Sequence, residues 1–289
     1  MRFSFYDKQG AVGVAAQASD KWFDLADLHL GFACGAGEIA ALDAAQRAAI
    51  AAQLAGTSAT PVDLGQVTLL PPIAPHARIF CVGLNYADHA AESAMAKPEF
   101  PVVFLRTYDS FVGHGQPLVL PAKSSAFDYE GEMVAVLGKG GRHIDVADAA
   151  ACVAGYSVAN EGSIRDYQLK RGPQWTMGKN FSRSGAMGPA FVTADELPAL
   201  GAGLAIATRL NGETVQSSNT RKLIFNIAQI ISYLSEAFVL QAGDVIVTGT
   251  PAGVGAARTP PLFMQEGDTA EVEVEGIGMV RNTVVREVP

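Results

Sequence analysis

The larger part of the chain, from about residue 102 onward, alternates short apolar runs with turns that contain glycine or proline. Short strands separated by such turns are typical of β-rich folds, in which a sheet closes or packs on a second sheet. We expect strands at Val102–Leu105, Met133–Leu137, Ala154–Ala159, Ala205–Leu210, Val245–Thr248, Ala270–Val274 and Gly278–Val285. A helix is expected at Ile227–Ala237, where isoleucine and leucine recur at helical spacing. The pattern therefore predicts an α+β, β-rich fold with a rolled or sandwich-like mixed sheet.

The first 68 residues differ from the rest, and we expect a small N-terminal domain over residues 1–68 and a larger domain over residues 69–289. Arg2–Tyr6 and Val12–Ala18 fit the two strands of a hairpin. Leu42–Ala55 is rich in alanine and fits a helix. Several prolines between residues 63 and 76 favour extended chain, so we expect a linker there.

Composition excludes several classes of partner. The 289 residues carry a formal net charge of -8 and contain no run of lysine or arginine, so we expect no nucleic acid as a partner. The apolar stretches fall short of the roughly 18 residues of a membrane span, and the first residues lack the apolar core of a signal peptide. The 3 cysteines show no metal-ligand spacing. We expect a cytoplasmic protein with reduced thiols and no membrane contact.

Three glutamates are candidates for a metal site. Glu130 and Glu132 are two apart at the start of an expected strand, so they project from the same side. Two carboxylates held this close repel unless a positive charge lies between them, and Mg²⁺ or Mn²⁺ prefers such oxygens. Glu161 follows the strand Ala154–Ala159 and could supply a third carboxylate. Taken alone, the pattern also fits a solvated strand face.

Cationic and polar side chains near these glutamates are candidates for binding an acid substrate. Lys179 lies among glycine, asparagine and aromatic residues, which is unlike a solvated charge run, and it could bind a carboxylate or an enolate. Arg165 is four positions after Glu161, so on a helical turn the two would share a face, and Gln168 follows three positions later. An ordinary surface ion pair and a loop lysine are the alternatives.

A histidine and a glutamate form a candidate catalytic pair. His89 and Glu92 are three apart, so a helix would place them side by side. A carboxylate that holds one tautomer of an imidazole suits a general base. Further along, Thr250 lies in a glycine-rich loop that could bind an anion through its backbone N–H groups. A structural histidine remains the alternative to the catalytic one.

These segments occur together in an order that resembles the fumarylacetoacetate hydrolase superfamily, over about residues 79–285. Members of that superfamily show D-Y-E-x-E, N-D-x-S-x-R-D-x-Q, G-K-x-F, T-G-T-P-x-G-V-G and G-x-G-x-x-R-N. In this chain the corresponding segments are Asp128–Glu132, Asn160–Gln168, Gly178–Phe181, Thr248–Gly255 and Gly276–Asn282, preceded by Asn85–His89. Each motif is modest alone, whereas the ordered set is specific.

The resemblance implies a mixed β-sandwich or β-roll, a homodimer, and one Mg²⁺ or Mn²⁺ per subunit. The metal ligands would be Glu130, Glu132 and Glu161, although better-known members carry aspartate at the third position. The resemblance also implies that a small-molecule 2-oxo or 2,4-dioxo acid is the substrate. The other residues at matching positions are the substrate-binding Lys179, Thr250, Arg165 and Gln168 and a lid dyad of His89 and Glu92.

A second departure from the family concerns an arginine beside the lid. Some members carry arginine where this chain has Leu84, and Arg106 is the residue that we expect to bind substrate in its place.

The reaction that we expect from the sequence is hydrolysis of a C–C bond in a 2,4-dioxo acid, such as an acylpyruvate or a diketo-deoxy sugar acid, giving a 2-oxo acid and a second acid. His89, oriented by Glu92, would activate water, and Lys179 would stabilise the departing enolate. The same site would also support decarboxylation of an oxaloacetate-like acid or isomerisation of a 2-hydroxydienoate. A non-catalytic metal-binding protein is a third possibility.

Overall fold

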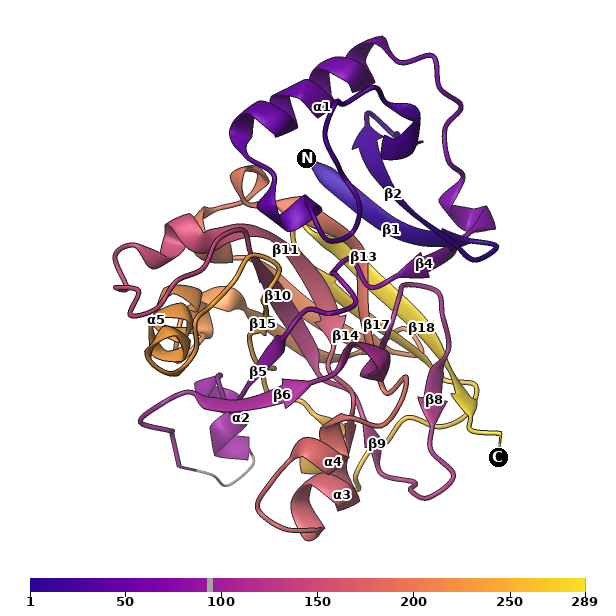
Figure 1. The fold of residues 1–289 in the computed structure, drawn as a ribbon. Coiled ribbons are helices and arrows are strands. Elements are labelled where there is room, and N and C mark those ends of the chain that lie inside the picture. The colour runs from indigo at the N-terminus through magenta and orange to yellow at the C-terminus, as the bar shows by residue number, and fades with distance from the viewer. Residues whose placement is uncertain (93–95, 289) are drawn as a thin grey trace.

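Two β-sheets packed face to face form the centre of the protein, as the computed structural model shows (Figure 1). The structure describes residues 1–92 and 96–288. The larger sheet has 11 strands, nine of them in the order β3-β2-β1-β13-β11-β10-β16-β5-β6, and the second sheet has the order β15-β14-β17-β18-β8. The short strands β9 and β12 pair with each other beside the larger sheet. The α+β, β-rich prediction is confirmed.

The strands and helices have the following bounds. The strands are β1 Arg2–Lys8, β2 Ala11–Ala18, β3 Lys21–Asp24, β4 Thr68–Leu70, β5 Ile79–Gly83, β6 Val102–Arg106, β7 Phe111–Val112, β8 Leu118–Leu120, β9 Phe127–Asp128, β10 Gly131–Leu137, β11 Val153–Asn160, β12 Ser163–Ile164, β13 Gly185–Thr193, β14 Ala205–Leu210, β15 Glu213–Asn219, β16 Val245–Val247, β17 Thr269–Val274 and β18 Gly278–Arg286. The helices are α1 Ala44–Gly56, α2 Ala87–Glu92, α3 Arg165–Lys170, α4 Thr176–Lys179 and α5 Ile227–Ala237.

Strand β10 is buried on both faces, which makes it the rigid centre of the fold. Met133 and Ala135 belong to a core that is shared with the second sheet, where Val272 is one of their partners. Val134 and Val136 alternate with them and pack into a second core on the opposite face. Because each face is covered, the start of this strand is held in one place, and that is where the candidate metal ligands lie.

The N-terminal segment joins the larger sheet directly. Strand β1 pairs with β13, and Phe3 lies opposite Phe191 in that register with a ring-centroid distance of 6.2 Å. Strand β4, inside the expected linker, pairs with β1, so this segment is a sheet strand and not a simple connection. Helix α1 packs Ile50 into the same core. The expected division at residue 68 stays a prediction.

Each strand expected from the sequence has a counterpart in the structure, and several further strands were not expected. The hairpin, the strand Ala205–Leu210 and the helix Ile227–Ala237 are confirmed. Among these further strands, β13 is interrupted by a Gly-Pro pair and β15 is polar at most positions, so neither shows a sequence pattern typical of a strand. None of the helices in the described part of the chain combines the length and the apolar character that crossing a membrane requires.

Replacing Phe3 tests whether the N-terminal strands share the core of the larger sheet. The Phe3 side chain is fully buried between β1 and β13, so Phe3→Ala should lower the free energy of unfolding by about 3–5 kcal/mol. Denaturant unfolding followed by circular dichroism measures it. The control Val12→Ala, at a position 60% exposed, should change stability by less than about 0.5 kcal/mol. Equal effects of the two substitutions would contradict a shared core.

Candidate metal centre and active-site cavity

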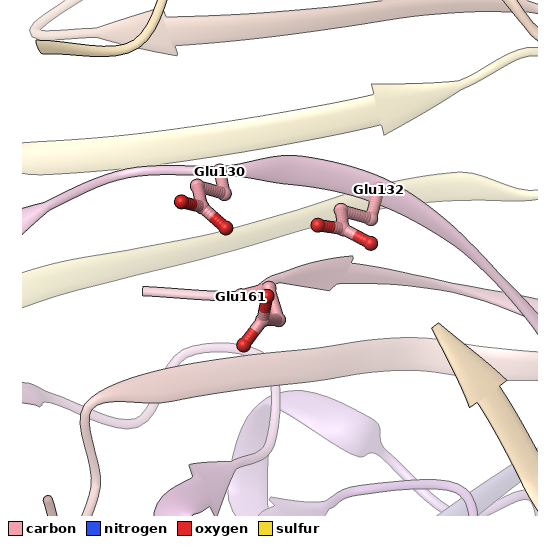
Figure 2. A group of neighbouring side chains, drawn as sticks. All are labelled: Glu130, Glu132 and Glu161. Carbon is pink, nitrogen blue, oxygen red and sulfur yellow. The ribbon is translucent and has the colours of Figure 1, made fainter. Parts of the chain in front are cut away.

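Pairing of β10 with β11 brings the three glutamates together. Gly131 lies opposite Asn160 in the antiparallel register, and the Glu161 N–H donates to the Glu130 carbonyl oxygen at 2.7 Å. One carboxylate oxygen from each of Glu130, Glu132 and Glu161 lies within 4.8 Å of the others, and all three residues are buried. Figure 2 shows Glu130 and Glu132 on the same side of their strand, with Glu161 on the neighbouring segment. We call these three residues the carboxylate triad.

Three cations compensate part of the negative charge of the carboxylate triad. Lys179 Nζ lies 2.6 Å from Glu130 Oε2 and 2.8 Å from Glu161 Oε2. Arg165 Nη2 lies 2.6 Å from Glu130 Oε1, and Arg106 Nη1 donates to Glu161 Oε1 at 3.0 Å. Among these contacts none reaches Glu132, whose Oε2 accepts the backbone N–H of Gly249. The compensation is therefore uneven.

The pKa values of the triad follow this unevenness. Burial raises the pKa of Glu132 well above its usual range, and the charges of Glu161 and Glu130 raise it further. Burial also acts on Glu130, yet Arg165 and Lys179 outweigh it and lower the pKa of that carboxyl. The pKa of Glu161 is raised, mainly by burial, with Lys179 opposing. A divalent cation would remove the remaining repulsion, and three carboxylates are the donors that Mg²⁺ and Mn²⁺ prefer, so the residues fit such an ion.

The candidate dyad lines the same cavity as Glu130 and Glu132 of the triad. His89 Nδ1 is 2.8 Å from Glu92 Oε1, both on α2. The N–H of Gly253 donates to both Glu92 oxygens, at 3.0 and 2.8 Å. Gly253 has φ +106°, and a Cβ there would lie 2.2 Å from the carbonyl oxygen of Val215, so only glycine fits. The glycine-rich loop thereby fixes the carboxylate that orients the imidazole.

A cavity of about 260 Å³ is lined by the dyad and by Glu130 and Glu132 of the triad, whereas Glu161 is not one of its lining residues. Its polar wall comes from His89, Glu92, Glu130, Glu132, Arg165, Gln168, Lys179 and Thr250. Its apolar wall comes from Val82, Leu84, Leu169, Trp175, Val254, Ala256 and Ala257. A larger hollow of about 790 Å³ lies over β1, β2 and residues 24–36, but it is lined by none of the predicted site residues. The smaller cavity is therefore the candidate active site.

Arg106 lies behind the carboxylate triad and does not line the cavity. Its side chain is completely buried, and its five N–H groups all point to protein oxygens, including Glu161 Oε1. The prediction that Arg106 binds substrate does not fit this placement, because no N–H group is left for a ligand. The prediction that Glu161 and Arg165 share a helical face is also wrong. Helix α3 begins only at Arg165, whose guanidinium contacts Asp128 and Glu130.

Several residues without an assigned role hold the site together. Asp128 accepts the Arg165 Nε–H at 2.7 Å and the backbone N–H groups of Gly255 and Ala256 at 2.7 and 2.9 Å. Gln216, on the polar strand β15, donates to Thr250 Oγ1 at 2.8 Å. The Thr250 hydroxyl in turn donates to the Gly131 carbonyl at 3.0 Å. No spacing signal marks Gln216, because its partners come from distant segments.

Comparison with known proteins identifies the class and then the family. The matching family model, described as the C-terminal part of fumarylacetoacetate (FAA) hydrolase, covers residues 78–285. The chain belongs to the fumarylacetoacetate hydrolase family. A rat mitochondrial protein named oxaloacetate tautomerase is 42% identical over 85% of this chain and 76% of its own length.

Solved structures agree with this assignment. A fumarylacetoacetate hydrolase from Exiguobacterium antarcticum is 30% identical over 99% of this chain and all of its own, with a TM-score of 0.82. A fumarylpyruvate hydrolase from Pseudomonas aeruginosa, solved in complex with Mn²⁺ and pyruvate, is 32% identical over 80% of this chain and 94% of its own, with a TM-score of 0.66. The chain is thus similar in fold to a protein whose structure contains a divalent metal.

Replacing the least compensated glutamate should separate metal binding from stability. Glu132→Gln removes a proposed metal ligand. Loss of a residue that only hydrogen-bonds to a ligand typically lowers metal affinity by roughly 10–100-fold, so Mn²⁺ affinity should fall by more than this here. In EDTA the same variant should unfold at a higher denaturant concentration than the wild type, because a buried, repelled carboxylate is gone. Titration calorimetry and denaturant unfolding measure the two effects.

The control for this experiment is Glu273→Gln, at a glutamate 48% exposed on β17, which should change neither quantity. Undiminished Mn²⁺ binding by Glu132→Gln would argue against the triad as the metal site.

Proposed function

We propose that this protein is a divalent-metal-dependent enzyme that catalyses keto–enol tautomerisation of a small, oxaloacetate-like 2-oxo acid. The observation that carries the proposal is one cavity lined by a buried lysine, a His–Glu pair and two triad carboxylates, with the third, Glu161, close to those two behind the lining. In this reaction a proton leaves carbon 3 and another joins the oxygen on carbon 2. A base, a proton return path and stabilisation of the enolate charge are sufficient for it.

The carboxylate triad would hold the ion, and the bound ion would act as a Lewis acid toward the 2-oxo group. Lys179 has three N–H donors, of which two contact Glu130 and Glu161, so one remains for an oxygen of the enolate. Burial opposes the charge on Lys179, yet Glu130 and Glu161 raise its pKa, so it stays an ammonium. Lys179 therefore serves as a fixed positive charge and not as the base.

His89 would move the proton. Its Nδ1 is turned toward Glu92, which leaves Nε2 as the nitrogen available to a ligand. Which nitrogen carries the proton depends on that contact, and a carboxylate at Nδ1 favours the tautomer with a free Nε2 lone pair. Because the Gly253 N–H donates to both oxygens of Glu92, the carboxylate is fixed, and it holds the imidazole in one orientation. This is the arrangement that a general base requires.

Two observations favour tautomerisation. Rat and human relatives that are 42% identical are named oxaloacetate tautomerase, and the reaction needs no attacking water. Hydrolysis of a 2,4-dioxo acid, which the sequence favoured, is the second candidate. The His89–Glu92 pair suits water activation, and the neighbouring structures include a fumarylpyruvate hydrolase and a maleylpyruvate hydrolase. Oxaloacetate decarboxylation and dienoate isomerisation use the same groups.

An assay on a panel of acids distinguishes these reactions. The panel holds oxaloacetate in its enol form, an acylpyruvate and a 2-hydroxydienoate, each with EDTA and then with restored Mg²⁺ or Mn²⁺. The proposal predicts metal-dependent loss of the enol absorbance of oxaloacetate without release of CO₂. Cleavage of only the acylpyruvate would favour the hydrolase instead. Turnover indifferent to EDTA, in protein shown to be free of metal, would contradict both.

Removing the imidazole tests the proposed base. His89→Ala should lower kcat by about 10²–10⁴-fold, the range for loss of a positioned acid or base, while Mn²⁺ affinity stays at the wild-type value. His76→Ala, at an exposed histidine outside the cavity, is the matched control and should leave kcat unchanged. If His89→Ala turned over as fast as the control, the dyad would have no catalytic role.

Assembly and location complete the proposal. A homodimer is expected from the family, and light scattering of the purified protein tests it. We also propose a cytoplasmic location and a small N-terminal domain over residues 1–68. The rat and human relatives carry the word mitochondrial in their names, so location in the source cell needs its own measurement.

A further inference from the structure

Arg106 ends strand β6 and has the most complete set of hydrogen bonds in the neighbourhood of the carboxylate triad. Its Nε donates to Ser110 Oγ at 3.1 Å. Its Nη1 donates to Glu161 Oε1 at 3.0 Å and to the Gly162 carbonyl at 3.1 Å. Its Nη2 donates to the Ser110 carbonyl at 3.3 Å and to Ser184 Oγ at 2.8 Å. The five donors of a guanidinium thus meet five acceptors.

Glu161 is the only charged group among these acceptors. The side chain of Arg106 is 0% exposed, and the ring of Phe111 covers the guanidinium at 4.3 Å from its centroid. The four neutral contacts fix the orientation of the guanidinium plane, and the fifth directs its charge at one oxygen of Glu161. A rigid donor fork of this kind positions a carboxylate more tightly than a flexible ammonium can.

The Glu161 carboxylate is consequently fixed at both oxygens. Arg106 donates to Oε1, and Lys179 donates to Oε2 at 2.8 Å. Lys179 also contacts Glu130 Oε2, so the same ammonium bridges one oxygen of Glu161 and one of Glu130. A glutamate side chain has one more torsion than an aspartate, so it needs more restraint to present an oxygen in one place.

We propose that Arg106 is a positioning residue that fixes Glu161 as the third metal ligand. The inference rests on the proposed metal site, and it assigns Arg106 to the ligand behind the cavity and not to the substrate. Partners that orient a metal ligand through hydrogen bonds contribute to affinity without touching the ion.

Arg106→Lys is the variant that separates geometry from charge. Lysine keeps the positive charge beside Glu161 but cannot reproduce the planar fork with five donors. If positioning matters, Mn²⁺ affinity should fall by about 10–100-fold, which is typical for losing a hydrogen-bond partner of a metal ligand. If Arg106 only neutralises charge, Arg106→Lys should bind Mn²⁺ as the wild type does.

The test is calorimetric titration of Mn²⁺ into EDTA-treated, desalted protein, with thermal unfolding of each variant to confirm folding. The matched control is Arg78→Lys, which alters another arginine–carboxylate pair. Arg78 Nε and Nη2 lie 2.8 and 2.5 Å from the Asp244 oxygens, away from the triad, so Mn²⁺ affinity should be unchanged. Wild-type affinity in folded Arg106→Lys would overturn the inference.

A second variant covers the case in which Arg106→Lys does not fold. Ser110→Ala removes the hydroxyl that accepts the Nε–H and leaves the guanidinium and its charge in place. It should weaken Mn²⁺ binding in the same direction by a smaller factor, and wild-type affinity would overturn the inference. If the wild type itself bound no Mn²⁺, both the proposed metal site and this inference would be wrong. That result differs from one in which the wild type binds Mn²⁺ and the variants bind it equally well, which would overturn the inference alone.

Discussion

Mutual repulsion among three buried carboxylates is the constraint on which the rest of this structure depends. Glu130, Glu132 and Glu161 lie within 4.8 Å of one another and out of water, an arrangement that costs free energy unless positive charge is supplied. The protein supplies part of it through Lys179, Arg165 and Arg106. The negative charge that these cations leave uncompensated is greatest at Glu132, and a divalent ion would compensate it.

The fold provides what this arrangement requires, which is rigid positions for like charges. Strand β10 is covered on both faces, and its pairing with β11 determines where Glu161 emerges. The glycine-rich loop connects the parts of the site, since Gly249 contacts Glu132, Gly253 contacts Glu92, and Gly255 contacts Asp128. The proposed metal ligands, the cations beside them and the proposed base are thus fixed relative to one another by backbone as well as by side chains.

Local patterns in the sequence were sufficient for many of the elements but not for the way distant segments meet. Alternation of apolar residues located β14 and β17, and helical spacing located α5. Strand β13, with its Gly-Pro pair, and strand β4, inside a proline-rich segment, form because neighbouring strands pair with them, which no local pattern records.

The site shows the same limit. The spacing of Glu130 and Glu132 and the ordered motifs pointed to eight residues that line the cavity. Arg106 was predicted to bind substrate, whereas it lies behind the triad. Its acceptors, Ser110, Gly162 and Ser184 among them, come from three separate segments, which no local pattern could reveal. Gln216 was not singled out, and Asp128 appeared only as part of a motif without a role, since their contacts are with backbone and side chains far away in the sequence.

The position of a bound ion tests the central claim most directly. Crystals grown with Mn²⁺ and measured at a wavelength where manganese scatters anomalously would locate it independently of any assumption about ligands. The account predicts one anomalous peak per chain, between the carboxylates of Glu130, Glu132 and Glu161. A peak elsewhere, or none in protein that binds Mn²⁺ in solution, would contradict it.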